Sequence, residues 1–243
     1  MKNILPLILL LFSVYALAQE KPNKIELLHA NTLEYDNSIA PNTRRLIGDV
    51  SFKHDDAIMH CDSAYLYSMT NSLDAFGNVH IIQADTIDVW SDKLNYNGNT
   101  KIAILTDNVK LDDKQMVLTT DKLTYNMKTK KGFYTAGGKI VDEENTLTSV
   151  IGYYYEDRND FFFKDSVVLV NPKYTMYSDT LLFNTNTEIA YFHGPTHIYS
   201  DENIIYCENG WYNTKTDQSQ FNENAYINSQ EQIIRGDSIY YDR

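Results

Sequence analysis

The chain contains two thiols, Cys61 and Cys207, and in an oxidising compartment such a pair can form a disulfide. Both occupy the same slot of a repeat described below, five repeats apart, so stacked strands would separate them by about 50 Å. A disulfide requires α-carbons within about 7 Å of each other. We therefore predict two half-buried packing cysteines that are not bonded to each other.

Acidic residues recur at a nearly constant spacing, at Asp62, Asp92, Asp121, Asp179, Glu208 and Asp237. Carboxylates stacked at strand spacing can share calcium ions. Each acid, however, stands where a strand is expected to start, and Asp commonly closes a turn there through its own backbone. No glycine-rich calcium loop accompanies the acids. The turn is the favoured interpretation, and we predict no metal site.

Neither a histidine pair nor a sequence motif indicates catalysis. His193 and His197 have the spacing of helical metal ligands, but Gly194 and Pro195 between them prevent a helix. On a strand the two histidines would lie about 13 Å apart. The GxSxG, HExxH, GxGxxG, CxxC and phosphate-loop patterns are all absent from the sequence, so we predict no enzyme and no cofactor.

A short pattern of acid, any residue, apolar, any residue, aromatic organises the whole chain. It occurs as NTLEY from Asn31, DSAYL from Asp62, DKLNY from Asp92, DKLTY from Asp121, IGYYY from Ile151, DTLLF from Asp179, ENGWY from Glu208 and DSIYY from Asp237. Successive occurrences are 31, 30, 29, 30, 28, 29 and 29 residues apart. A repeat of about 29 residues predicts stacked structural units.

A second pattern runs in phase with the first, a turn residue followed by alternating apolar residues. Examples are GDVSF from Gly48, GNVHI from Gly77, DNVKL from Asp107 and DSVVL from Asp165. Together with polar turns, the two patterns predict four strands of about five residues in each repeat. The 19 tyrosines and 10 phenylalanines also favour strands. We expect an all-β, elongated repeat protein, about 75 Å long at the usual strand spacing, with two facing antiparallel sheets.

Alternate residues of a strand share one face, and the apolar positions of both patterns then form one inner surface. The predicted inner residues are Leu33, Tyr35, Val50, Phe52, Val79, Ile81, Leu94, Tyr96, Val109, Leu111, Leu123, Tyr125, Ile140, Val167, Leu181 and Phe183. Such a surface is either a closed hydrophobic core or an apolar ligand groove. The residues themselves do not distinguish these two alternatives.

The first residues, MKNILPLILLLFSVYALAQE, predict a signal peptide over 1–18 that is cleaved after Ala18. Residues 19–243 are then expected to form one domain outside the cytoplasm. The formal net charge of the whole chain is −12. This acidic balance argues against nucleic acid as a partner. An anionic ligand would depend on apolar contact and on a few local cations, namely Arg44, Arg45, Lys128, Lys130 and Lys131.

With the signal peptide and the two in-phase patterns, the chain resembles the OstA family, the LptA-type lipopolysaccharide-transport proteins. The resemblance spans roughly Lys24 to Arg243. It implies a V-shaped β-jellyroll in the periplasm, related to the N-terminal domain of the outer-membrane protein LptD. It also implies that lipid A acyl chains occupy the inner surface, and that the protein pairs with other Lpt-type proteins or with itself through exposed edge strands. The larger number of repeats, the acidity and the dense tyrosines depart from the family pattern.

Two other functions remain open at this stage. One is a β-helical enzyme acting on polysaccharide through paired carboxylates, although the acids recur once per repeat instead of forming a singular cluster. The other is an adhesive repeat protein whose outer face presents Tyr65, Tyr154, Trp211 and Tyr240 to a partner. The chain stops just after DSIYY, so the last strand is either an exposed edge or continues into a longer protein.

Overall fold

The computed structural model describes residues 23–83, 87–155 and 157–242, so the predicted signal peptide lies outside the described part of the chain. The described residues form antiparallel β-strands joined by turns, which confirms the all-β prediction. Among these residues no helix is long and apolar enough to cross a bilayer.

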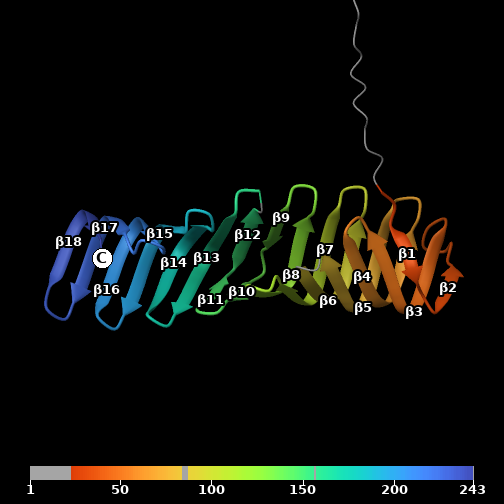
Figure 1. Ribbon diagram of the computed structural model, residues 1–243, viewed down its shortest axis with the longest axis horizontal. Helices are drawn as coiled ribbons and strands as arrows, with labels where there is room; N and C mark the ends of the chain where they lie inside the picture. The colour runs from red at the N-terminus through yellow and green to blue at the C-terminus, as the bar shows by residue number, and fades with distance from the viewer. Residues whose placement is uncertain (1–22, 84–86, 156, 243) are drawn as a thin grey trace, which may run out of the picture.

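The described residues form eighteen strands of one continuous sheet, which is bent lengthwise into two facing walls (Figure 1). The bounds are β1 Glu26–His29, β2 Thr32–Tyr35, β3 Thr43–His54, β4 Ala57–Tyr67, β5 Ser72–Gln83, β6 Ile87–Asn97, β7 Ile102–Asp112, β8 Val117–Asn126, β9 Lys131–Tyr134, β10 Gly138–Val141, β11 Thr146–Ser149, β12 Ile151–Tyr155, β13 Asp160–Asn171, β14 Tyr174–Asn184, β15 Ile189–Ser200, β16 Asn203–Asn213, β17 Ser219–Ser229 and β18 Ile233–Tyr241.

Each long strand crosses from one wall to the other, so we call it a rung. Three further rungs are each interrupted and therefore consist of two short strands: β1 with β2, β9 with β10, and β11 with β12. We count each pair as one rung because both of its strands pair with the same long strand, β3, β8 and β13 respectively. Wall A contains β2, β9, β12 and those halves of the long strands that lie in the same hydrogen-bonded row as these three short strands. Wall B contains β1, β10, β11 and the halves that lie in the same row as those. The prediction of four five-residue strands per repeat was therefore wrong: two bent rungs make one repeat.

A bulge of two residues bends every second rung at the corner between the walls. In β3 the register with β4 shifts between Ile47 and Val50, where Gly48 and Asp49 have φ values of 77° and 47°. Equivalent left-handed pairs occur in β5 (Gly77, Asn78), β7 (Asp107, Asn108), β13 (Asp165, Ser166) and β17 (Glu223, Asn224). Glycine, Asn and Asp tolerate this conformation best, which explains the turn residues that open the second sequence pattern.

The recurring acids support these bulges from the neighbouring rung. Asn78 Nδ2 donates to Asp62 Oδ2 at 2.8 Å, Asn108 Nδ2 donates to Asp92 Oδ2 at 2.8 Å, and Asn224 makes the same bond to Glu208. The acids therefore lie in the middle of rungs, at the outer corner, and the prediction that they start strands was wrong. Among the described residues no group of three or more His, Cys, Asp or Glu side chains could hold a metal ion.

The ladder keeps inner residues in register from one end of the body to the other. In wall A the pairing runs Leu33–Leu46–Ala64–Ala75–Leu94–Leu105, and it continues as Tyr134–Gly152–Phe163–Leu181–Phe192–Gly210–Phe221–Ile239. In wall B it runs Leu27–Phe52–Met59–Ile81–Val89–Leu111–Leu118–Ile140–Leu147–Leu169–Met176–Ile198–Ile205–Ile227–Ile234. Cross-strand neighbours at this spacing pack against each other, so the predicted stacking is confirmed.

The register corrects the sequence pattern in the fifth repeat. Gly152 and Tyr154 face inward on β12, because they pair with Phe163 and Phe161. The motif therefore starts at Val150 and not at Ile151, which makes both adjoining repeats 29 residues long. Tyr154, predicted on the outer face, consequently belongs to the inner face.

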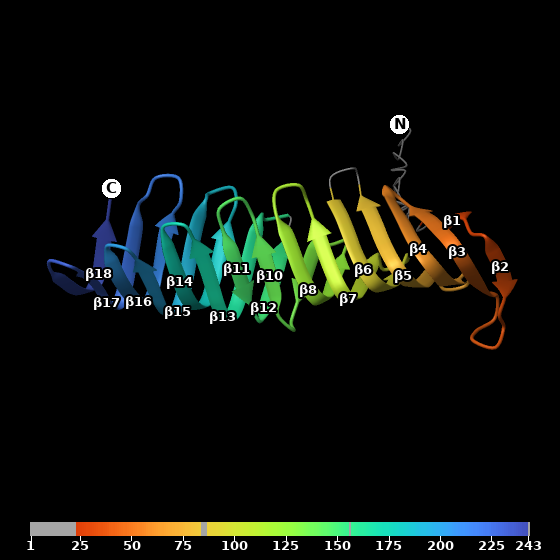
Figure 2. The ribbon, with the colours of Figure 1, turned by 90° about the horizontal axis from the view of Figure 1, so that it is seen from below.

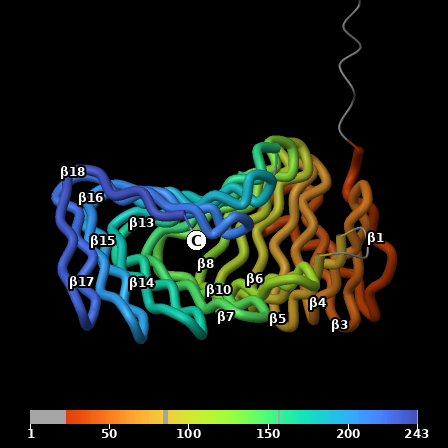
Figure 3. Tube along the Cα trace, turned by 60° about the vertical axis from the view of Figure 1, so that its left-hand side comes forward, coloured from red at the N-terminus to blue at the C-terminus, as the bar shows by residue number. Residues whose placement is uncertain are grey.

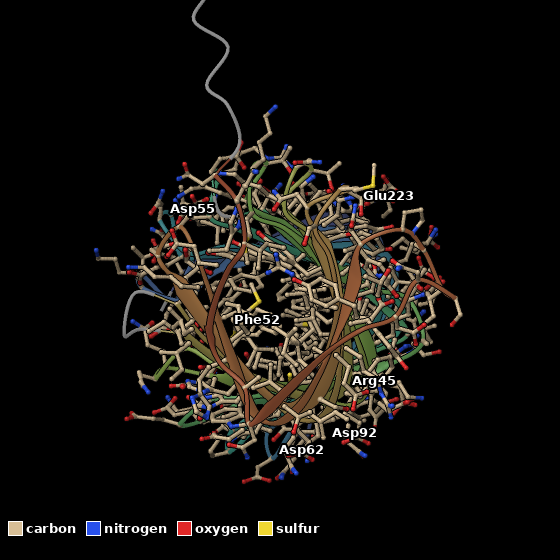
Figure 4. All side chains as sticks on the ribbon, turned by 90° about the vertical axis from the view of Figure 1, so that its right-hand side faces the viewer. Arg45, Phe52, Asp55, Asp62, Asp92 and Glu223 are labelled. Carbon is tan, nitrogen blue, oxygen red and sulfur yellow. The ribbon has the colours of Figure 1, made fainter. Side chains whose placement is uncertain are left out.

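The body is elongated, with hairpin turns in rows along its edges (Figures 1, 2 and 3). Viewed along its length, the walls of the N-terminal end form a V with Asp62 and Asp92 at the corner and Phe52 between the walls (Figure 4). Glu223, a corner residue of β17, lies on another side of the same view. The corner thus winds around the long axis, as the right-handed twist of β-sheets requires.

Candidate functional site

The space between the walls, called the groove below, is filled by side chains in the N-terminal half. Buried residues from Ile25 to Tyr134 form one continuous cluster there. Phe52 and Tyr96 are both 0% exposed. The predicted inner residues Val50, Phe52, Val79, Ile81, Leu94, Tyr96 and Val109 all belong to this cluster. This half is therefore a packed hydrophobic core.

Polar contacts bridge the two rims of this half opposite the corner. In the β3–β4 turn of wall B, Asp55 Oδ2 accepts from Lys101 Nζ, in the β6–β7 turn of wall A, at 2.7 Å. Next to it, His54 Nδ1 lies 2.6 Å from the Tyr96 hydroxyl, and the His54 Nε2 atom lies 2.8 Å from the Asn23 carbonyl oxygen. We call these five residues the clasp.

The segment from Asn23 to Ile25 lies between the rims and completes the clasp. Asn23 Nδ2 donates to Asp55 Oδ1 at 2.8 Å, and the Asn23 carbonyl accepts from Asn71 Nδ2 at 3.0 Å. The Ile25 side chain is buried. Hydrogen bonds from Lys101 and then from Asn23 lower the pKa of Asp55 below its ordinary value of 3.8, so this carboxylate stays charged at neutral pH.

A cavity of about 500 Å³ lies between the walls and overlaps the C-terminal part of this core, because Ile81, Leu105 and Leu123 belong to the cluster and also line the cavity. Its lining is mainly apolar and comes from both walls: Ile81, Ile87, Val89, Ala103, Leu105, Leu111, Met116, Leu118, Leu123, Tyr125, Met127, Gly132, Phe133, Tyr134, Ile140, Gly152, Tyr153, Tyr154, Phe161 and Phe163, with Asp56, Gln83, Asp113 and Lys130 as polar members. This volume and lining are typical of sites for small apolar ligands.

Beyond the cavity the inner face is less tightly covered. A second buried cluster, which includes Phe163, Val167, Leu181 and Phe192, forms the floor. The inner residues around it are only partly buried, namely Phe161, Leu169, Tyr174, Phe183, Ile198, Ile205, Tyr212, Ile227 and Ile239. Tyr154 and Phe161 stack with ring centroids 4.6 Å apart. The C-terminal half therefore presents an accessible apolar surface between its walls.

The predicted inner residues consequently have three different environments. The first group, Val50, Phe52, Val79, Leu94, Tyr96 and Val109, is enclosed in the N-terminal core, while Ile81 belongs to this core and also lines the cavity. The second group lines the cavity or the C-terminal floor: Leu111, Leu123, Tyr125, Ile140, Val167, Leu181 and Phe183. The third comprises Leu33 and Tyr35, which are 42% and 68% exposed. They share the inner face with Leu46 and Arg44, but β2 is the terminal strand of wall A and little covers it.

Sequence reasoning missed most of the aromatic lining of the cavity. Phe161 and Phe163 stand before the second pattern, so neither of the two in-phase patterns includes them. Tyr154 was missed because the motif was placed one residue too late. The period itself could have found it, since uniform steps of 29 residues put an inner position at Tyr154.

The remaining candidate residues have structural roles. Cys61 and Cys207 are not bonded to each other, as predicted, but both are buried instead of half-buried, and burial raises the pKa of each thiol to about 12. His193 contacts Asn209 Oδ1 through Nδ1 at 3.1 Å, while His197 packs against Tyr206. Of the predicted local cations, Arg45 lies 3.5 Å from Glu34 and Lys130 borders the cavity.

Comparisons with known proteins identify the family of this chain. The model of the OstA-like protein family matches residues 22–179 and 175–237. A search of curated proteins finds no match. Among solved structures, LptH from Pseudomonas aeruginosa, described as the LptA-homologous periplasmic component of the lipopolysaccharide transport device, aligns with 13% identity and a TM-score of 0.37. That alignment covers 41% of this chain and 76% of LptH. Since the family model accounts for most of the sequence, the chain belongs to the OstA-like protein family.

Proposed function

We propose that this protein binds lipopolysaccharide in the periplasm and carries its lipid A acyl chains in the groove toward the outer membrane. Membership of the OstA-like family supports a role in lipopolysaccharide transport. The observation that carries the proposal is the apolar cavity between the walls, with a partly exposed apolar surface beyond it. No step of this function requires a catalytic group.

Apolar burial supplies the binding free energy in this proposal. Each methylene group moved from water into the groove contributes about 0.8 kcal/mol, so about ten methylene groups of one acyl chain contribute about 8 kcal/mol. The formal charge of −12 gives no long-range attraction for an anionic glycolipid. Recognition of the head group would depend on single cations near the rims, such as Lys130 beside the cavity.

A pair of neighbouring phenylalanines provides a sharp test. Phe161 lines the cavity, whereas Phe162 pairs with Tyr153 and Leu182 in the outward register of the same strand. A photoreactive phenylalanine derivative at position 161 should crosslink to purified, radiolabelled lipopolysaccharide. The same derivative at position 162 is the matched control, because it differs only in the face that it occupies.

Crosslinking at 161 well above that at 162, reduced by excess unlabelled lipopolysaccharide, is the expected result. Equal crosslinking at both positions, or none at 161 in a folded protein, would rule out lipid binding between the walls. Circular dichroism of both variants verifies that the sheet is intact.

A further inference from the structure

The two halves of the groove differ in a way that bears on where a ligand can lie. We propose that the acyl-chain site is confined to the cavity and to the part of the groove from β9 to β18. The N-terminal part of the groove before the cavity, around Leu46, Phe52 and Leu73, is closed by packing and by the clasp and lies outside the ligand path. This inference rests on the proposed function, and it adds the location and the inner end of the binding site.

Side chains already occupy the N-terminal half from wall to wall. Leu46, Leu73 and Leu94 of wall A and Val50 and Phe52 of wall B are between 0% and 2% exposed. They belong to a single buried cluster. An interior packed to this extent has no space for an acyl chain unless the walls separate.

The clasp opposes such a separation. The Lys101–Asp55 ion pair joins the turn of one wall to the turn of the other, and Asn23 bonds to Asp55 and to Asn71 on opposite rims. Inside them, the His54–Tyr96 contact links the walls a second time. Parting the rims would leave His54 and Tyr96 without these partners, which is costly for buried polar groups.

The boundary between the closed part of the groove and the cavity lies beside the clasp, because Asp56 of the β3–β4 turn and Ile81 of β5 line the cavity. Tyr134 of β9 lies further along the cavity. Its ring lies against Gly138 and Gly152, where an added Cβ would overlap it, and its hydroxyl lies 2.7 Å from Ser149 Oγ. Tyr134 is buried, belongs to the N-terminal cluster and also lines the cavity. Ile81, Leu105 and Leu118 likewise belong to the cluster and to the lining, so the packed core forms one side of the cavity and the inner end of the cavity lies at β5, beside the clasp.

The test labels the wild-type protein, so that no substitution disturbs the core. A lipopolysaccharide that carries a diazirine in one acyl chain is bound, irradiated and located by peptide mass spectrometry. Peptides of the C-terminal half, around Phe161, Phe183 and Ile205, should carry about tenfold or more label than peptides of the N-terminal half, around Leu46 and Leu73. Samples kept dark and samples with excess unlabelled lipopolysaccharide serve as controls.

The outcomes separate this inference from the proposed function. Label around Leu46 and Leu73 comparable to or above that of the C-terminal half would overturn the confined site while lipid binding stood. Label only on outward residues, or none that unlabelled lipopolysaccharide competes away, would overturn both.

Two lysine variants test the clasp itself. Lys101→Ala removes the ion pair that crosses between the rims, whereas Lys93→Ala removes an ion pair of similar length, 2.9 Å to Asp107, at the corner. Lys101→Ala should raise the label in N-terminal peptides several-fold, and Lys93→Ala should leave it at the wild-type level. If both variants keep the wild-type pattern, the clasp does not close this half.

Discussion

Substitutions at one corner position should change stability in opposite directions in two repeats. Gly77 in β5 and Glu223 in β17 both open a corner bulge, with φ values of 74° and 59°. A residue with a Cβ costs about 1–2 kcal/mol in this conformation. Glycine costs about 0.5–1 kcal/mol because it loses more conformational freedom on folding.

For Glu223→Gly, the difference between the cost of a Cβ and the cost of glycine predicts an increase of about 0.5–1 kcal/mol in the free energy of unfolding. For Gly77→Ala the same two costs predict a decrease of similar size in the free energy of unfolding. The new methyl group would also overlap Asp62 Oδ2. Moving that carboxylate breaks its bond from Asn78, which adds about 0.5–1.5 kcal/mol. The total loss for Gly77→Ala is about 1–2.5 kcal/mol.

Thermal unfolding followed by circular dichroism measures both effects, at about 2–4 °C per kcal/mol for a chain of this size. Glu223→Gly should raise the melting temperature and Gly77→Ala should lower it. Adding Asp62→Ala to Gly77→Ala should recover part of the loss, because it removes the group that the methyl meets. Shifts of the same sign for the two single variants would refute the explanation of the corner.

Three further predictions concern buried and bridging groups. Tyr96→Phe leaves His54 Nδ1 without the hydroxyl 2.6 Å away and should cost about 1–3 kcal/mol in thermal unfolding; an unchanged melting temperature would contradict the buried contact. Because the pKa of Asp55 is lowered in the folded state by its hydrogen bonds, its stabilising effect is present above pH 3.8 and is lost as the pH falls through the folded value. The stability difference between wild type and Asp55→Asn should therefore shrink in acid, and a constant difference would count against it. Cys61 and Cys207, with thiol pKa values raised to about 12 by burial, should react with a disulfide reagent at pH 8 only after unfolding, so immediate reaction in the native protein would disprove their burial.

Periodicity predicted much of the fold because the same physical constraint acts on every rung. A rung must place apolar side chains between the walls and a bend at the corner. Leu94 and Val109 satisfied these rules and were correctly assigned to the inner face. The uniform spacing also predicted that Cys61 and Cys207 are too far apart to bond, and both are free.

Other features depend on contacts that a one-dimensional pattern does not contain. Five-residue pieces separated by Gly48 and Asp49 look like two strands, because alternation alone does not distinguish a turn from a bulge within one strand. Asp62 looks like a turn residue, but its partner is Asn78 on the next rung. The filled N-terminal half and the accessible C-terminal half have similar apolar patterns. The difference between them follows from side-chain volume across the groove and from the clasp, both of which are tertiary.

The register has a consequence for how the chain reaches its native state. Every rung pairs only with rungs that are close to it in sequence, from β1 with β3 to β17 with β18. Folding can therefore begin locally and spread to neighbours, as in other repeat proteins whose stability is a sum of unit and nearest-neighbour terms. The N-terminal units have the larger buried cluster, so we expect folding to begin there and to spread toward the C-terminal units.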